Sequence, residues 1–150
     1  MPDTDLLALF VRESNWIEGI KRDPTAEEIA AHEYFLSRDT PVISTFELFV
    51  ERIQPGAVLR NKPGLDVQVG NHVAPPGGPE IEQRLQSLIY QANAHGEQVA
   101  YMLHRDYEYL HPFTDGNGRS GRVWWLKMMG GPEKVPLGFL HTWYYQSLAR

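Results

Sequence analysis

The chain has 150 residues, of which 42% are hydrophobic, with no cysteine and a formal net charge of −5 at pH 7. This length suits one domain with a hydrophobic core, the lack of cysteine excludes disulfides and thiolate metal sites, and the negative charge argues against general nucleic-acid binding. Because no apolar run reaches about 18 residues and the N-terminus lacks the basic start of a signal peptide, we expect a cytoplasmic protein without a membrane span.

Apolar residues at helical spacing, together with helix-start and helix-stop signals, divide most of the chain into helices. Capping boxes, in which a Ser or Thr and a Glu three residues later satisfy each other's backbone groups, are expected to open helices at Thr25 and Ser44. Gly19 suits a helix stop and Pro79 suits a first helical turn. The expected helices cover approximately residues 5–17, 25–37, 44–54, 79–95, 97–109, 118–129 and 137–148.

The pattern changes between Gly56 and Gly78. Residues 58–60 and 67–69 have the composition of two short strands, and the turn-forming stretch 61–64 lies between them. The sequence therefore predicts an all-α fold, a helical bundle with one β-hairpin.

The segment between the expected helices 97–109 and 118–129 has the composition of a phosphate-binding loop. Glycines at positions 116 and 118 let the backbone approach a ligand closely and adopt positive φ angles. The helix that follows presents unpaired N–H groups and the positive end of its dipole, a geometry that binds phosphate.

Charged side chains around this loop fit the same interpretation. Arg119 and Arg122 share a helix face and suit a polyphosphate. Asp115 offers a hard oxygen ligand that indicates Mg²⁺, and a neutral His111 can take a proton from an attacking hydroxyl. Each of these residues alone is usually structural, but their occurrence in order between positions 111 and 122 favours one site.

This segment resembles the Fic family motif, His-Pro-Phe-x-Asp-Gly-Asn-Gly-Arg-x-x-Arg, at every fixed position. The resemblance implies a Fic fold and an enzyme, a nucleotidyltransferase that moves AMP from ATP to a Ser, Thr or Tyr hydroxyl of a target protein. It implies that His111 is the general base and that Asp115 binds Mg²⁺. The nucleotide-binding residues that it implies in this segment are Asp115, Gly116, Asn117, Gly118, Arg119, Ser120, Gly121 and Arg122.

The expected hairpin lies where the family carries a flap that holds the target segment by strand pairing. The resemblance implies that Val67, Gln68, Val69 and Gly70 face the target and the nucleotide, and that Tyr144 and Tyr145 lie near the adenine. An ordinary surface hairpin and core packing of the last helix are the alternative interpretations of these two segments.

A second segment, Ser14-Asn-Trp-Ile-Glu18-Gly19, resembles the inhibitory motif of the family, Ser/Thr-x-x-x-Glu-Gly/Asn. Helix propensity does not explain Glu18, because a negative charge in a last turn opposes the helix dipole. The resemblance implies that Glu18 pairs with Arg122 in place of the γ-phosphate, which leaves ATP in an unreactive geometry, and that Ser14 steadies Glu18. We therefore expect one domain in which an inhibitory segment, residues 1–22, packs on a Fic core, residues 23–150.

Other functions remain open at this point. Glu18 can instead orient a water that removes AMP from a target, or the chain can be a non-catalytic module that only binds nucleotide. Gly118 argues against phosphate transfer, and the intact Asp-Gly-Asn-Gly stretch argues against phosphocholine transfer. The expected partners are ATP and a target protein, and self-association stays open. A zinc site is not expected, because no paired ligand spacing occurs at His32, His72, His95, His104 and His141.

Overall fold

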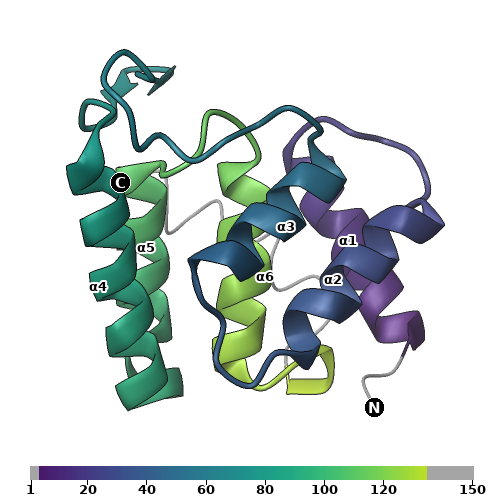
Figure 1. The fold of residues 1–150 in the computed structure, drawn as a ribbon. Coiled ribbons are helices and arrows are strands. Elements are labelled where there is room, and N and C mark those ends of the chain that lie inside the picture. The colour runs from purple at the N-terminus through teal and green to yellow at the C-terminus, as the bar shows by residue number, and fades with distance from the viewer. Residues whose placement is uncertain (1–3, 135–150) are drawn as a thin grey trace.

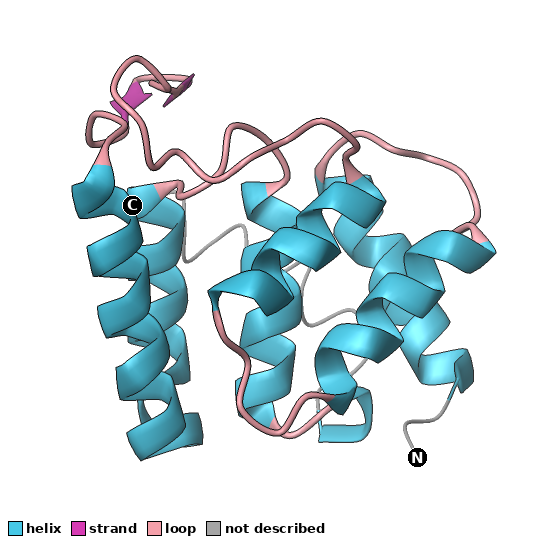
Figure 2. Cartoon of the chain, viewed as in Figure 1, coloured by secondary structure: helices cyan, strands magenta, loops and turns pink. Residues whose placement is uncertain are grey.

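The structure, a computed structural model, describes residues 4–134, and within them the expected helical bundle with one hairpin is confirmed (Figures 1 and 2). None of the helices in this range is long and apolar enough to cross a membrane. The helices are α1 (Thr4–Ile17), α2 (Ala26–Ser37), α3 (Ile43–Ile53), α4 (Pro79–His95), α5 (Ala100–Leu110) and α6 (Asn117–Met129), with short 3₁₀ turns η1 (Gly96–Val99) and η2 (Pro132–Lys134). Strands β1 (Gln68–Val69) and β2 (His72–Val73) form the antiparallel hairpin.

Helix α6 lies at the centre of the bundle. It contacts α1, α2, α3 and α5, while α4 packs on the outer side of α5 (Figure 1). Trp124 of α6 packs in a cluster with one aromatic ring from each of α2, α3 and α5. The centroid distances are 5.0 Å for Phe35–Phe46 and 5.6 Å for both Phe46–Trp124 and Tyr107–Trp124. Because all four rings are buried, the position of α6 along the bundle is fixed by shape as well as by apolar burial.

The loops that follow α1, α3 and α5 gather at one end of the bundle, with the hairpin beside them (Figure 2). The N-terminus of α6 also lies at this end (Figure 1). The fold therefore brings segments that are far apart in the sequence to the start of a single buried helix.

The predicted pairing of the hairpin was wrong. Gln68 pairs with Val73 and Val69 with His72, so the turn is the tight Gly70–Asn71 link and not residues 61–64. Gly70 has a φ of 58°, which such two-residue turns require. Residues 58–60 do not pair with 67–69; instead Leu59 forms an isolated bridge with Phe113.

The predicted helix boundaries hold with two local exceptions. Helix α3 begins before Ser44, because Val42 N–H donates to Thr45 Oγ1 at 3.1 Å and so takes the place of the predicted capping box. The expected helix 97–109 begins as the 3₁₀ turn η1. The predicted box at Thr25 is confirmed, with reciprocal bonds of 3.1 and 2.8 Å to Glu28. The expected helix 137–148 lies outside the described residues.

Two buried histidines make the fold sensitive to mild acid. Burial lowers the pKa of His32 to about 4 and that of His104 to about 3, against 6.5 for an ordinary histidine. Below pH 6.5 the unfolded chain therefore binds more protons than the folded one, so the free energy of unfolding falls as pH drops from 6.5 toward 4. We expect each histidine to contribute a loss of about 2 kcal/mol between about pH 7 and 5.

Urea titrations at several pH values measure this loss. His32→Gln removes one titrating group, so its stability should change less with pH than that of the parent. Equal pH dependence in the two proteins would contradict the assignment. Glu28 adds little between pH 7 and 5, because the stability that it contributes is lost between its unfolded pKa of 4.5 and its folded pKa of about 2, and this loss is common to both proteins.

Candidate active site

His111 begins the loop between α5 and α6 in an unusual backbone conformation. It caps α5 with a φ of 47°, in the left-handed region that few residues other than glycine adopt. Its backbone N–H bonds to Tyr107 O at 2.9 Å, and its ring Nδ1 contacts the carbonyl oxygen of Glu108. A carbonyl only accepts, so Nδ1 carries the hydrogen and Nε2 carries the lone pair.

The surroundings of His111 favour its neutral form. Burial is the largest effect that lowers its pKa, and the nearby charges of His72 and Arg60 lower it further. The Glu108 carbonyl and the Glu18 carboxylate act in the opposite direction without reversing the shift. An imidazole that is neutral near pH 7 can act as a proton acceptor.

The loop is fixed by Asn117. Its amide accepts from Phe113 N–H at 2.9 Å and donates to Phe113 O at 2.8 Å, and the side chain is 6% exposed. Gly116 precedes it with a φ of 77° and opens α6. In the described state Asn117 shapes the loop from inside, and its predicted contact with nucleotide stays a prediction.

Asp115 presents an exposed carboxylate beside the start of α6. Its Oδ1 accepts from Gly116 N–H at 2.8 Å. Residues 4–134 contain no group of three or more His, Cys, Asp or Glu side chains that could hold a metal ion alone. One carboxylate fits Mg²⁺, which usually completes its six ligands with substrate phosphates and water.

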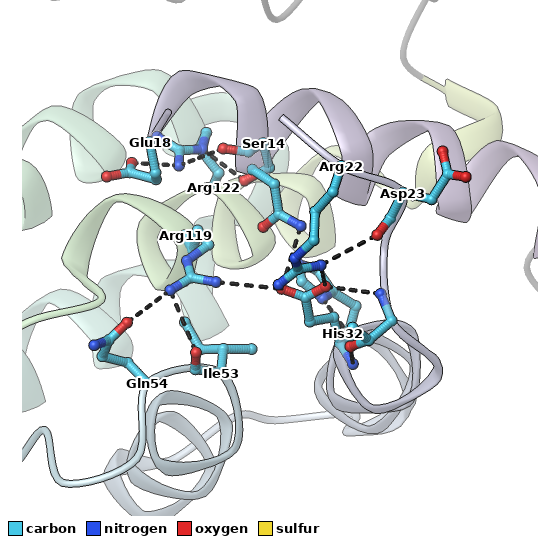
Figure 3. Close-up of polar contacts among 12 residues, drawn as sticks. Ser14, Glu18, Arg22, Asp23, His32, Ile53, Gln54, Arg119 and Arg122 are labelled. Carbon is cyan, nitrogen blue, oxygen red and sulfur yellow. Dashed lines mark hydrogen bonds and ion pairs between the residues drawn. The ribbon is translucent and has the colours of Figure 1, made fainter. Parts of the chain in front are cut away.

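Arg122 is engaged by the end of α1. Its Nε donates to Ser14 Oγ at 2.8 Å, and its Nη2 donates to Ser14 O at 3.0 Å and to Glu18 Oε2 at 2.6 Å (Figure 3). The guanidinium is 1% exposed, whereas the Glu18 side chain is 38% exposed. The sequence assigned Ser14 to Glu18, which stays a prediction; in the structure Ser14 binds Arg122 and so orients the partner of Glu18.

Gly118 allows Glu18 to approach the start of α6. A Cβ atom at position 118 would clash with the Glu18 carboxylate and would lie 3.0 Å from Arg122 Nη1. Glu18 itself follows the last residue of α1 and is not inside the helix. Its charge therefore faces a guanidinium and the positive end of α6, which offsets the unfavourable end of its own helix.

The hairpin stands beside His111. His72 of β2 contacts Tyr109 O through Nε2 at 2.8 Å, and its ring centroid lies 5.9 Å from that of His111. Val69 and Val73 are 56% and 67% exposed, so the hairpin offers an apolar edge to a partner. Tyr144 and Tyr145, predicted near an adenine, lie outside the described residues.

The sequence from the first turn of α2 to the end of α6, residues 26–129, matches the family model described as Fic/DOC family. The chain belongs to this family. Three similar proteins bear the name Protein adenylyltransferase Fic: those of Drosophila willistoni, Drosophila virilis and Drosophila mojavensis are 35%, 34% and 32% identical over 80 residues. The match covers 49% of this chain and 15%, 16% and 15% of the three relatives, so the chain spans a small part of their length.

The first arginine of the Fic motif, Arg119, is also engaged. Its Nη2 donates to Gln54 Oε1 at 3.0 Å and to Ile53 O at 3.3 Å, and its Nη1 lies 3.6 Å from Glu28 Oε2 (Figure 3). Only 5% of Arg119 is exposed. Within the described residues, both motif arginines thus bind protein groups where the family resemblance expects phosphates.

Sequence reasoning missed the part that Glu28 takes in this Fic site. Besides its capping bonds it accepts from Arg22 at 2.8 and 3.2 Å and from Asn15 at 3.3 Å. Burial raises its pKa, but the bonds and the charge of Arg22, together with the Thr25 bonds, outweigh burial and bring the value to about 2. Glu28 therefore stays charged and joins the end of α1 to Arg119.

Proposed function

We propose that this chain transfers AMP from ATP to a Ser, Thr or Tyr hydroxyl of a target protein, and that Glu18 inhibits the transfer. The observation that carries the proposal is the position of His111, with its Nδ1 on a carbonyl and its Nε2 as acceptor, at the end of the bundle where the motif arginines begin α6. The names of the Drosophila relatives support the same reaction.

The chemistry follows from the roles of these groups. Nε2 of His111 accepts the proton of the attacking hydroxyl, whose oxygen forms a bond to the α-phosphorus. The bond from that phosphorus to the oxygen bridging the β-phosphate breaks, and pyrophosphate leaves. Arg119 and Arg122 stabilise the charge that develops on the leaving group. Mg²⁺, held by Asp115 and phosphate oxygens, would neutralise part of the same charge.

Inhibition by Glu18 follows from the same geometry. Arg122 cannot offer Nη2 to a phosphate while it binds Glu18 Oε2 at 2.6 Å. A γ-phosphate near this carboxylate would also meet a like charge at short range. ATP is then left to bind with its α-phosphorus out of line with the attacking hydroxyl. The target segment would lie along the hairpin residues 67–73, paired to the exposed edge.

Isotope position distinguishes AMP transfer from phosphate transfer. The Glu18→Gly variant is incubated with Mg²⁺ and with ATP labelled on either the α- or the γ-phosphate. We expect label on protein only from α-labelled ATP, and loss of that label when EDTA removes Mg²⁺. Label from γ-labelled ATP would contradict the proposal, and transfer that persists in EDTA would contradict the role of Asp115.

Removal of AMP is a second candidate function, favoured by the partial exposure of Glu18. Its side chain is 38% exposed and bonds Arg122 through Oε2, so the carboxylate is also within reach of solvent water. The test is to feed the AMP-modified product of Glu18→Gly to the unchanged protein. Release of AMP that Glu18→Gln does not reproduce would support this function, and a stable product would exclude it.

A further inference from the structure

Arg60 is a fully buried arginine, with 0% of its surface exposed, that lies between the hairpin and the motif loop. Its guanidinium donates to four backbone carbonyls. Nη1 bonds Leu65 O and Pro75 O, both at 2.9 Å, and Nη2 bonds Leu110 O at 2.8 Å. Nε bonds His111 O at 2.5 Å.

The four carbonyls belong to two structural groups. Residues 65 and 75 flank the hairpin on its two sides, whereas residues 110 and 111 are the end of α5 and the proposed base. The backbone adds to the junction, because Arg60 N–H donates to Pro112 O at 2.8 Å and Gly78 N–H donates to Arg60 O at 2.9 Å. Figure 1 shows the segment after α3 crossing the α5–α6 loop on its way to the hairpin.

A charge in this position needs a reason. Removing a guanidinium from water is costly unless each donor finds a partner, and burial lowers the pKa of Arg60, with Asp66 opposing the shift. An apolar side chain would fill the space without that cost, but it could not tie four carbonyls from separate segments to one planar group. The planar fork of arginine fits such a task.

We propose that Arg60 is a positioning residue that fixes the hairpin relative to His111, and through it the target hydroxyl relative to the proposed base. This inference rests on the proposed function. The four guanidinium bonds involve neither Asp115 nor the motif arginines, so Arg60 governs the transfer step and the target but not ATP binding. A displacement of about 1 Å between reacting groups can lower a rate about 100-fold.

The experiment uses the full chain with Glu18→Gly and compares Arg60→Met with Arg60→Lys. Leu85→Ala serves as a control for lost packing, because Leu85 is fully buried on α4 and its apolar side chain makes none of the hydrogen bonds of Arg60. Three quantities are measured: the rate of labelling at saturating ATP, the affinity for ATP with Mg²⁺ by calorimetry, and amide hydrogen exchange in residues 66–78. Ala74 and Gly77 report there, since their N–H groups bond Val67 O and Asp66 Oδ1.

For Arg60→Met we expect labelling about 100-fold slower, amide exchange of the hairpin segment about tenfold faster, and ATP affinity within about twofold of the parent. The labelling and exchange rates of Arg60→Lys should lie between those of the parent and of Arg60→Met, because an ammonium keeps the charge but cannot reach all four carbonyls. Leu85→Ala should lose thermal stability while its labelling rate at saturating ATP stays near that of the parent below its melting range.

The pH profile separates positioning from a merely structural effect. The charge of Arg60 lowers the pKa of His111, as does that of His72, while the backbone carbonyl of Glu108 raises it; the Glu18 carboxylate, which also raises it, is absent from the Glu18→Gly background. Losing that charge raises the pKa of His111, so the acidic limb of labelling should move to higher pH in Arg60→Met. It should stay in place in Arg60→Lys and in Leu85→Ala.

Two results would overturn the inference. One is a labelling rate and a hairpin exchange rate in Arg60→Met that equal those of the parent. The other is an ATP affinity that falls by the same factor as the labelling rate, without a shift of the acidic limb of the pH profile. If Arg60→Met does not fold, Arg60→Lys decides by its labelling rate, its ATP affinity and its hairpin exchange: unchanged labelling and exchange, or a loss of ATP affinity in proportion to labelling, would overturn the inference. If the Glu18→Gly parent shows no labelling, the proposed function fails. Amide exchange then still tests whether Arg60 fixes the hairpin, and an exchange rate of residues 66–78 in Arg60→Met equal to that of the parent would show that it does not.

Discussion

His111→Ala in the Glu18→Gly background is expected to lower labelling by about 100- to 10,000-fold, the range that a general base contributes. The imidazole presents Nε2 as acceptor because Nδ1 is held on the Glu108 carbonyl, and its ring lies in contact with that of His72. ATP affinity should remain, since the phosphate groups are assigned to the arginines and to the start of α6. Calorimetry and the labelling rate measure the two quantities separately.

His95→Ala is the matched control, because His95 is exposed in the last turn of α4, at the end away from the motif loop. It should label at the rate of the parent. Labelling of His111→Ala at the parental rate would show that His111 is not the base. With His111 present, the rate should fall as pH drops through its pKa, which burial holds below the ordinary value.

Glu18→Gly is expected to raise labelling of the otherwise unchanged chain at least about tenfold. A charge-assisted hydrogen bond contributes about 1.5 to 3 kcal/mol, and the partial exposure of Glu18 favours the lower end of that range, since solvent screens it. A loss of about 1.4 kcal/mol corresponds to one factor of ten in the population with Arg122 free. The measurement is the initial rate of transfer from α-labelled ATP.

Glu18→Gln controls for the change in backbone freedom. Glutamine keeps the length of the side chain and one acceptor for Arg122 but removes the charge that repels phosphate, so its rate should lie between those of the parent and the glycine variant. Ser14→Ala is expected to act in the same direction and more weakly, because it removes the bond that holds Arg122 Nε at 2.8 Å. Equal rates in parent and Glu18→Gly would contradict inhibition.

Local signals in the sequence were sufficient for most of the helical fold. The capping box at Thr25 and the stop at Gly19 depend on neighbours within a few residues, and both are present, Gly19 with a φ of 80°. The motif loop was predictable for the same reason, since Gly116 and the start of α6 are adjacent in the chain. The hairpin turn also has a local signal, the Gly70-Asn71 pair, but the turn-forming residues 61–64 gave a competing signal, and the prediction followed that one.

Other features depend on contacts between distant residues, which local patterns do not report. Leu59 pairs with Phe113 and not with a nearby strand, and Arg60 finds its carbonyl partners up to 51 residues away. Glu28 looked like a capping residue only, yet it also approaches Arg119 at 3.6 Å. Spacing on α1 placed Ser14 beside Glu18, but it does not show that Ser14 binds Arg122 of α6.

Occupation of both motif arginines suggests how the end of α1 is coupled to the site. Glu28 binds Asn15 of α1 and lies against Arg119, while Glu18 binds Arg122. Movement of the end of α1 would thus remove partners of Arg122 directly, and it would remove one partner of Glu28, the carboxylate that lies 3.6 Å from Arg119. The proposed inhibition is in this sense a property of the junction between α1, α2 and α6.

The most direct test of the proposed adenylyl transfer is the mass of the products. Glu18→Gly is incubated with ATP and Mg²⁺, alone and with native cell lysate, and the modified chain or target peptide is identified by mass spectrometry beside the same variant carrying His111→Ala. The proposal predicts an AMP adduct on a Ser, Thr or Tyr side chain with Glu18→Gly and none when His111 is also replaced. A phosphate adduct, an AMP adduct independent of His111, or no adduct on any protein would contradict it.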